Sequence, residues 1–137
     1  MENCPFCNPD RKLLLAETQL SYVLANKEPA DLGHLLIVPK IHVKSVDCLT
    51  DIAAADLIIT FKKSVIIIKK SIYWEGINGL LNEGNVAGQT REHFHMHLFT
   101  RRRGDNLKNM SRIDDRREEI KESELSLLKC VFEEFSE

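Results

Sequence analysis

The sequence lacks an excess of basic residues, because its 19 lysines and arginines are balanced by 21 acidic residues and give a net charge of −2. Proteins that bind nucleic acid over a large surface are strongly basic, so the composition argues against nucleic acid as a partner. The run Arg101-Arg102-Arg103 is local, and we expect it to be a solvated strand end.

The sequence also lacks a long uninterrupted apolar run. Its most apolar segment, residues 51–74, is interrupted by four lysines, so we expect no membrane-spanning helix. The first ten residues, MENCPFCNPD, are polar and do not contain the apolar stretch of a secretory leader. We therefore expect a cytoplasmic protein whose cysteines stay reduced, so that Cys4 and Cys7 serve another purpose than a disulfide.

Internal repeats, low-complexity tracts and linkers are absent as well. The 137 residues are 43% hydrophobic and 29% charged, a balance typical of a globular protein that can form its own core. The sequence therefore predicts one domain over residues 1–137.

Hydrophobic patterning predicts one long helix at residues 51–74. Thr50 or Asp51 can cap its start, and Gly76 follows its end. Apolar residues at helical spacing are expected to form its buried stripe. These residues are Ile58, Phe61, Val65, Ile68 and Ile72.

Short apolar segments bounded by turn residues predict five strands, at residues 11–18, 21–26, 33–40, 77–84 and 93–101. The first two would form a hairpin with a tight turn at Gln19-Leu20. Residues from 114 onward are expected to be helical, and the apolar stripe of that helix would be Leu125, Leu128, Phe132 and Phe135. This order of elements indicates an α+β fold with an antiparallel sheet.

The segment HFHMHL, residues 93–98, has a histidine at every second position. Side chains alternate between the two faces of a strand, so the three histidines would share one face while Phe94, Met96 and Leu98 pack on the helix from the other. Neighbouring imidazoles would lie roughly 6.5–7 Å apart. Three histidines on one straight strand are too widely spaced to bind one zinc ion together, so at least one remains for chemistry. The alternative is a chance alternation of surface histidines.

The segment CPFC, residues 4–7, has the two-residue spacing of a zinc knuckle and of a redox pair. A redox Cys-x-x-Cys normally follows a strand and opens a helix, and no strand is predicted before Cys4, which argues against redox chemistry. The remaining cysteines, Cys48 and Cys130, are expected to be packing residues.

Three segments together resemble the histidine triad (HIT) nucleotide-binding family. HFHMHLF resembles its His-x-His-x-His signature, GHLLIVPKIH (33–42) its glycine-histidine strand, and LNEGNVAGQT (81–90) its glycine-glutamine loop. Their order and spacing match over residues 4–106, which leaves residues 114–137 as a C-terminal helical extension. The resemblance implies a five-stranded antiparallel sheet with one long helix and a C-terminal helix, usually paired into a homodimer across a continuous sheet.

The resemblance also implies an enzyme that transfers or hydrolyses nucleotidyl groups at the α-phosphorus of purine nucleotide conjugates, such as nucleoside phosphoramidates or dinucleoside polyphosphates. His95 matches the histidine that attacks phosphorus to form a covalent intermediate. A neutral imidazole suits that role near pH 7. The other matched positions comprise His97, Gln89 and Thr90 for the phosphate and leaving group, and Asn26 and Asn82 for the nucleoside.

In the zinc-containing branch of the family, the metal ligands match Cys4, Cys7, His42 and His93. Two cysteines and two histidines form a complete tetrahedral set, so the resemblance implies a structural zinc ion distant from the phosphorus. His34 is interpreted as structural. Arg91, Arg101 and Arg103 fall on the histidine face and could meet a phosphate, although solvent exposure is the simpler expectation.

Two other functional classes are compatible with parts of the sequence. One is a nucleotide-binding or partner-binding module with little turnover, which shares every motif except the need for His95. The other is a small zinc-dependent nucleic-acid binder, which the net charge of −2 disfavours.

Overall fold

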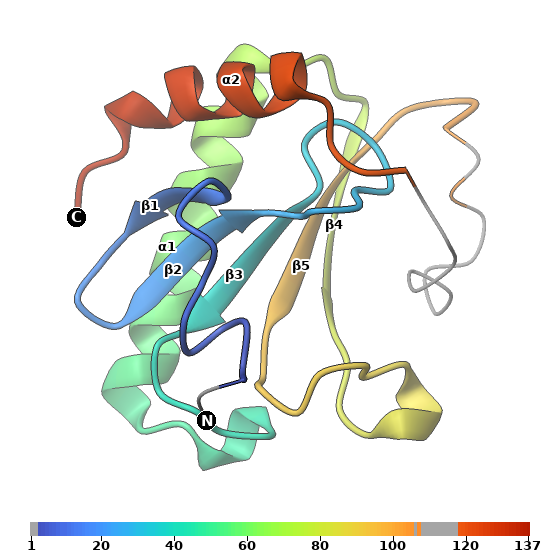
Figure 1. The fold of residues 1–137 in the computed structure, drawn as a ribbon. Helices are drawn as coiled ribbons and strands as arrows, with labels where there is room; N and C mark the ends of the chain where they lie inside the picture. The colour runs from blue at the N-terminus through green and yellow to red at the C-terminus, as the bar shows by residue number, and fades with distance from the viewer. Residues whose placement is uncertain (1–2, 106, 108–117) are drawn as a thin grey trace.

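A computed structural model describes residues 3–105, 107 and 118–137, and it contains a five-stranded sheet with two helices (Figure 1). The strands lie in the order β1-β2-β3-β5-β4, and each neighbouring pair is antiparallel. The strands are β1 (Leu14–Glu17), β2 (Ser21–Ala25), β3 (Leu35–Pro39), β4 (Gly76–Leu81) and β5 (Met96–Arg101). The helices are α1 (Asp51–Ser71) and α2 (Glu122–Val131). The predicted α+β fold and its five-stranded antiparallel sheet are confirmed.

Within the described residues, three short 3-10 turns accompany these elements. They are η1 (Val46–Cys48), η2 (Asn85–Ala87) and η4 (Phe132–Glu134). Among the residues that the structure describes, no helix has the length and apolar continuity needed to cross a bilayer.

The turn between β1 and β2 lies at Gln19-Leu20, as predicted. The backbone N–H of Thr18 donates to the carbonyl of Ser21 at 2.9 Å, and the hydroxyls of both residues donate to one oxygen of Asp56, at 2.7 and 2.6 Å. Asp56 lies in α1. The hairpin is therefore bonded to the helix that covers the sheet.

Helix α1 begins where the sequence predicts and ends earlier. The Thr50 hydroxyl accepts a hydrogen bond from the Ala53 N–H at 3.1 Å, which satisfies one of the unpaired N–H groups of the first turn. Lys69 and Lys70 lie in the last turn, where they complement the helix dipole. The chain becomes extended at Ile72, so the predicted end at residue 74 is wrong by three residues.

The predicted stripe of α1 is wrong at Ile58, which is 53% exposed. Ile68 and Ile72 are buried, while Phe61 and Val65 pack at the edge of the core. The helix is apolar around most of its circumference, so several stripes satisfy the same spacing, and packing against the sheet selects one of them. The selected face comprises Ala53, Leu57, Thr60, Ser64, Ile67 and Ile68.

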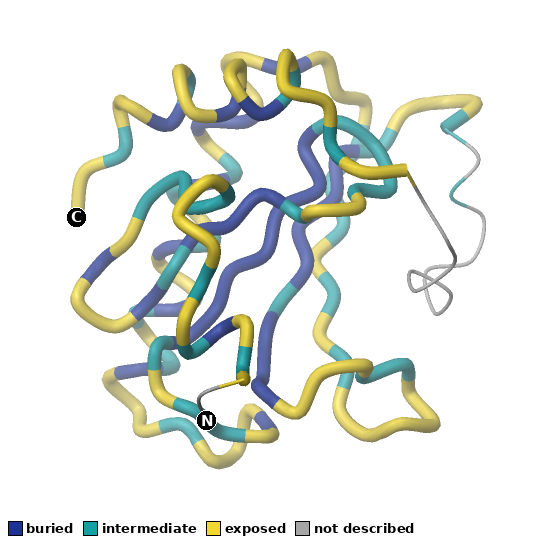
Figure 2. The backbone as a smooth tube through the Cα atoms, in the orientation of Figure 1, coloured by how far each residue is buried: buried dark blue, intermediate teal, exposed yellow. Residues whose placement is uncertain are grey.

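The main core lies between the sheet, α1 and α2, and the central strands are buried along most of their length (Figure 2). Leu125, Leu128 and Phe132 of the C-terminal segment join this core, and Phe135 packs against it, as predicted. The predicted helical start at residue 114 lies outside the described residues, and α2 itself begins at Glu122. Cys48 and Cys130 are exposed, so their assignment as packing residues is wrong.

Most of the predicted strand boundaries differ from the structure by one to three residues. The largest differences are at the start of β1, which begins at Leu14 instead of residue 11, at the start of β5, which begins at Met96 instead of residue 93, and at the end of β4, which ends at Leu81, before Gly84 turns the chain with a φ of 88°. Within β4, a Cβ at position 79 would lie 2.7 Å from the ring of Phe61, so glycine lets α1 approach the strand without displacing that ring. None of these differences changes the order of the sheet.

Arg101 at the end of β5 is not a solvated residue, because it forms an ion-pair network. Its guanidinium donates to Asp105 at 2.7 and 3.2 Å, to the Asn78 side chain at 2.8 Å and to the carbonyl of Leu107 at 2.6 Å. These bonds hold the pKa of the Asp105 carboxyl well below its ordinary range. Arg103, in contrast, is exposed and pairs with Glu75 at 3.5 Å. The network fastens the chain after β5 to the neighbouring strand β4.

We predict that Asp105→Asn lowers the free energy of unfolding by about 1.5–3 kcal/mol at pH 7, the range for hydrogen bonds to charged groups. Because the pKa of Asp105 is depressed in the folded state, the carboxylate stabilises the fold above its unfolded pKa of about 4 and loses that contribution as the pH falls toward the folded value. Urea denaturation of both proteins should show a difference that shrinks below about pH 4.

The matched control for this prediction is Asp47→Asn, at an exposed carboxylate in η1, which should change stability by less than about 0.5 kcal/mol. A difference between wild type and Asp105→Asn that stays constant as the pH falls would contradict the proposed ion pair.

Candidate functional site

The segment 93–98 places its histidines and its apolar residues on opposite faces, as predicted. Phe94, Met96 and Leu98 pack in the main core with α1. The rings of His95 and His97 lie together on the other face, with centroids 5.0 Å apart. Side chains already alternate between the two faces at residues 93–95, before β5 begins. The Phe94 N–H donates to the carbonyl of Val43 at 2.7 Å and holds this part of the chain extended. All three histidines of the segment are buried.

His95 has a ring orientation that leaves one nitrogen available for chemistry. Its Nδ1 lies 2.9 Å from the carbonyl oxygen of His93. A carbonyl only accepts hydrogen bonds, so Nδ1 carries the proton and Nε2 keeps its lone pair. Burial lowers the pKa of His95, and the nearby charge of Arg91 lowers it further. The ring is therefore a neutral imidazole at pH 7, with Nε2 as its basic and nucleophilic atom.

His97 is oriented by His34, a residue to which the sequence assigned no site role. The Ala30 N–H donates to Nδ1 of His34 at 2.9 Å, which places the proton of neutral His34 on Nε2. That atom lies 3.0 Å from Nδ1 of His97, so His97 accepts there and carries its own proton on Nε2. The His34 ring also stacks on Phe99, with centroids 4.1 Å apart. His97 is thus prepared as a hydrogen-bond donor, and its ring centroid lies 5.0 Å from that of His95.

Asn26 lies at the edge of this histidine pair. Its amide nitrogen is 3.3 Å from Nε2 of His34, and its side-chain oxygen accepts from the Glu28 N–H at 3.0 Å. Asn26, the residue predicted to bind the nucleoside, is therefore next to the His34–His97 pair.

The loop before the histidine segment is closed by its own amide side chains. Gln89 accepts from the Gly84 N–H at 2.7 Å and donates to the Lys44 carbonyl at 3.0 Å, and the Asn82 amide faces the Gly88 carbonyl at 3.4 Å. Thr90 and Arg91 are exposed at the entrance to the segment. The loop is adjacent in sequence to His95, and the amides of Gln89 and Asn82 bond its backbone.

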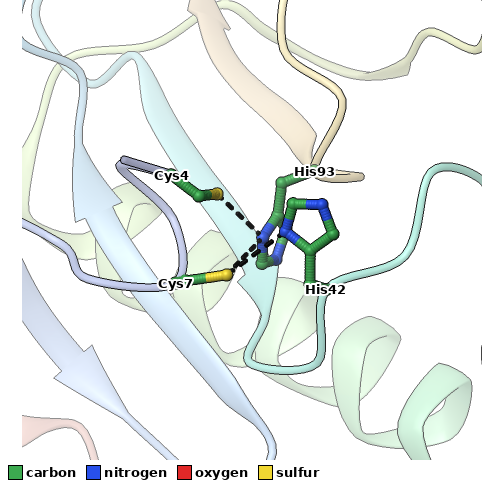
Figure 3. Close-up of side chains that lie close together, drawn as sticks. All are labelled: Cys4, Cys7, His42 and His93. Atoms are coloured by element: carbon green, nitrogen blue, oxygen red, sulfur yellow. Dashed lines mark hydrogen bonds between the residues drawn. The ribbon is translucent and has the colours of Figure 1, made fainter. Parts of the chain in front are cut away.

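The four predicted metal ligands converge on one point (Figure 3). The N-terminal segment supplies Cys4 and Cys7, the turn after β3 supplies His42, and the segment before β5 supplies His93. Their ligand atoms all lie within 4.8 Å of one another. Because β3 and β5 are antiparallel neighbours, the end of one strand lies beside the start of the other, which brings the two histidines together.

Three sulfur-to-nitrogen distances in this cluster are close to those of a tetrahedral zinc site. Cys4 Sγ lies 3.3 Å from His93 Nδ1, and Cys7 Sγ lies 3.2 Å from His42 Nδ1 and 3.5 Å from His93 Nδ1. Zinc bonds of about 2.0–2.3 Å in tetrahedral geometry separate ligand atoms by roughly 3.3–3.8 Å. His93 Nε2 donates to the carbonyl of Pro39 at 2.7 Å, which leaves Nδ1 unprotonated toward the sulfurs.

Two groups of the cluster have shifted pKa values. Burial, followed by the adjacent Cys4 thiol, raises the pKa of Cys7, and burial lowers the pKa of His93. Without a cation, both groups therefore favour their neutral forms. A divalent cation at the centre would favour the two thiolates and the neutral imidazoles, which are the forms that bind zinc.

A model of the HIT domain family matches residues 9–104 of the sequence. The chain belongs to the HIT domain family. The match includes the three histidines, the glycine-glutamine loop and His42, and it begins after Cys4 and Cys7. The two cysteines of the candidate metal site therefore lie outside the matched region, and that site depends on the geometry described above.

HIT relatives include enzymes. A bis(5'-adenosyl)-triphosphatase from Dictyostelium discoideum is 34% identical over 124 residues, which cover 85% of this chain and 83% of the relative. An adenosine 5'-monophosphoramidase from Schizosaccharomyces pombe is 36% identical over 85 residues, which cover 62% of this chain and 61% of the relative. A crystal structure described as a Zn-bound histidine triad family protein from Mycobacterium smegmatis matches with a TM-score of 0.78 at 23% identity, covering 96% of this chain and 94% of that one.

We predict that long-range ¹H–¹⁵N NMR at neutral pH will find His95 as the Nδ1–H tautomer and both His34 and His97 as Nε2–H tautomers. The carbonyl of His93 and the N–H of Ala30 fix these assignments. His34→Phe keeps a ring against Phe99 and removes the donor to His97, so the spectrum of His97 alone should change. A wild-type spectrum with His95 protonated on Nε2 would contradict the assignment.

Proposed function

We propose that this HIT protein is a nucleotidyl hydrolase or transferase that acts at the α-phosphorus of purine nucleotide conjugates. The observation that supports this most strongly is the pairing of His95, whose Nε2 keeps its lone pair, with His97, whose Nε2 carries a proton. One ring can attack phosphorus while its neighbour donates to a phosphate oxygen. The names of the two HIT enzymes above both describe adenosine nucleotide substrates, which agrees with this proposal.

The proposed reaction has two displacements. His95 Nε2 attacks the α-phosphorus, a P–N bond forms, and the bond from phosphorus to the leaving group breaks, so that the leaving group departs with the bonding electrons and takes up a proton. Water then attacks the same phosphorus and gives up a proton to solvent, which balances the proton taken up by the leaving group. The P–N bond breaks, its electrons return to Nε2 of His95, and a nucleoside monophosphate is released. Each step uses a moderately good leaving group, which splits one difficult hydrolysis into two easier substitutions.

Other residues would position the substrate. His97 would donate from Nε2 to a non-bridging oxygen, where negative charge increases in the transition state. Gln89 and Thr90 would bind the phosphate and leaving group, with Gln89 exchanging its bonds to Gly84 and Lys44 for bonds to substrate. Asn26 and Asn82 would bind the nucleoside.

We propose further that the Cys4, Cys7, His42 and His93 cluster holds a structural zinc ion. The ligand spacing and the His93–Pro39 hydrogen bond support this. When bound, the ion would tie the N-terminal segment to the ends of β3 and β5. The proposed catalytic residues His95 and His97 are not among the four ligands of this cluster.

The homodimer and the cytoplasmic location implied by the family resemblance are also proposals. The sheet has two edge strands, β1 and β4, and Leu81 on β4 is 43% exposed. A sheet continued across the edge at β4 would cover that side chain.

The decisive test of the proposed activity is rapid quench of the protein with labelled adenosine phosphoramidate, followed by mass spectrometry. We expect an AMP adduct on His95 in wild type. His95→Ala should lose on the order of 10³-fold or more in kcat, because it removes the nucleophile, while AMP binding stays within about twofold. The absence of turnover with any nucleotidyl substrate would favour a nucleotide-binding or partner-binding module instead.

Removal of zinc by a chelator should lower the melting temperature by roughly 10 °C or more, because a structural zinc site contributes directly to folding. Cys4→Ser should reproduce this loss and reduce the zinc content measured by mass spectrometry. Cys130→Ser, an exposed cysteine on α2, is the matched control and should change neither quantity. An apo protein that melts at the holo temperature would refute a structural role for the metal.

A further inference from the structure

Phe6 lies between the two cysteines of the metal cluster and is buried, with 8% of its surface exposed. Its ring packs on the face of the sheet opposite α1, in a small core with Leu24, Leu36 and Val38. The segment that carries Phe6 contains no regular strand or helix, so its position depends on this packing and on the Cys4 and Cys7 side chains on either side.

The ring of Phe6 contacts the proposed nucleophile. Its centroid lies 4.8 Å from that of His95, with the two planes tilted by 54°, and 5.7 Å from that of His93 in an edge-on arrangement. The second aromatic neighbour of His95 is His97, at 5.0 Å. The His95 ring therefore meets Phe6 and His97 as well as the carbonyl of His93.

The hydrogen bond of His95 limits the rotation of the ring about its Cβ–Cγ bond but does not stop it. Nδ1 lies 2.9 Å from the His93 carbonyl, and a hydrogen bond tolerates a spread of angles, so the plane of the imidazole can still tilt around this contact. In-line attack requires the lone pair of Nε2 to point at the phosphorus, and lone-pair direction changes with the ring plane. Neighbouring rings are the contacts that restrict that plane.

We propose that Phe6 is a positioning residue that sets the ring plane of His95, and that the metal cluster acts on the nucleophile through it. Cys4 and Cys7 would hold a short arc of chain at both ends, with Phe6 at its centre against His95. The cluster also contains His93, whose carbonyl is the acceptor for His95. Two contacts would thus connect the metal centre to His95. One is the contact of the Phe6 ring with the His95 ring, and the other is the hydrogen bond from His95 to the His93 carbonyl. This inference rests on the proposed function of His95.

The test compares Phe6→Leu with Phe132→Leu, which shortens a buried phenylalanine in the other core and has no contact with the site among those the structure describes. An aromatic ring shifts the NMR signals of nearby protons, so Phe6→Leu should move the His95 ring-proton resonances toward their unshifted positions. It should also reduce kcat for adenosine phosphoramidate by about 10- to 100-fold, with KM and the Kd for AMP within about twofold. Phe132→Leu should lower the melting temperature and change none of these.

Chelation of zinc from the wild-type protein supplies a second arm that does not use activity. If the cluster holds Phe6 in place, the His95 ring-proton resonances should move in the direction produced by Phe6→Leu. Unchanged resonances in the apo protein would overturn the link between the metal centre and the nucleophile.

Two results would overturn the role of Phe6. One is a loss of stability with unchanged kcat and His95 resonances, which would make it a packing residue. The other is a higher KM and a weaker AMP Kd with unchanged kcat, which would make it a substrate contact. If wild type shows no turnover, the proposed function fails, and a crystal structure of Phe6→Leu decides the role of Phe6: a changed His95 ring plane supports it and an unchanged plane overturns it.

Discussion

The antiparallel pairing of β3 with β5 is the constraint on which the site depends. In this register Leu36 lies opposite His97, and the same pairing brings His34, before β3, to His97 and the Pro39 carbonyl, at the end of β3, to His93. A shift of one residue would move every side chain of β5 to the other face and break both contacts. The buried face of β5 prevents that shift, because Leu98 and Phe94 would then leave the core.

Hydrogen bonds then give similar imidazoles different chemistry. Three of the histidines are assigned a tautomer by a backbone group: a carbonyl for His93 and His95, and an N–H for His34. Nδ1 of His93 is left unprotonated and faces the sulfurs of Cys4 and Cys7. Nε2 of His95 is left as the nucleophilic nitrogen. The sequence spacing of two makes the rings neighbours, and the backbone around them makes their roles different.

Much of this arrangement could be predicted from the sequence, since alternation along a strand is a property of local geometry. The predicted alternation placed Phe94 and Leu98 in the core and the histidines on the opposite face, as the structure has them. The partner of His97 could not be found in this way, because His34 is 63 residues away and meets it only through strand pairing. The buried face of α1 was ambiguous for a similar reason: Ile58 and Leu57 are equally apolar, and only the sheet distinguishes them.

We infer that β3–β5 pairing presents Nε2 of His95 to a nucleotide phosphorus while His93 faces the metal. A crystal structure of the zinc-loaded protein with AMP would show both contacts. We expect His95 Nε2 at about 3–3.5 Å from the phosphorus, with Nδ1 still bonded to the His93 carbonyl. A structure in which His95 binds the metal, or in which AMP lies away from His95 and His97, would contradict it.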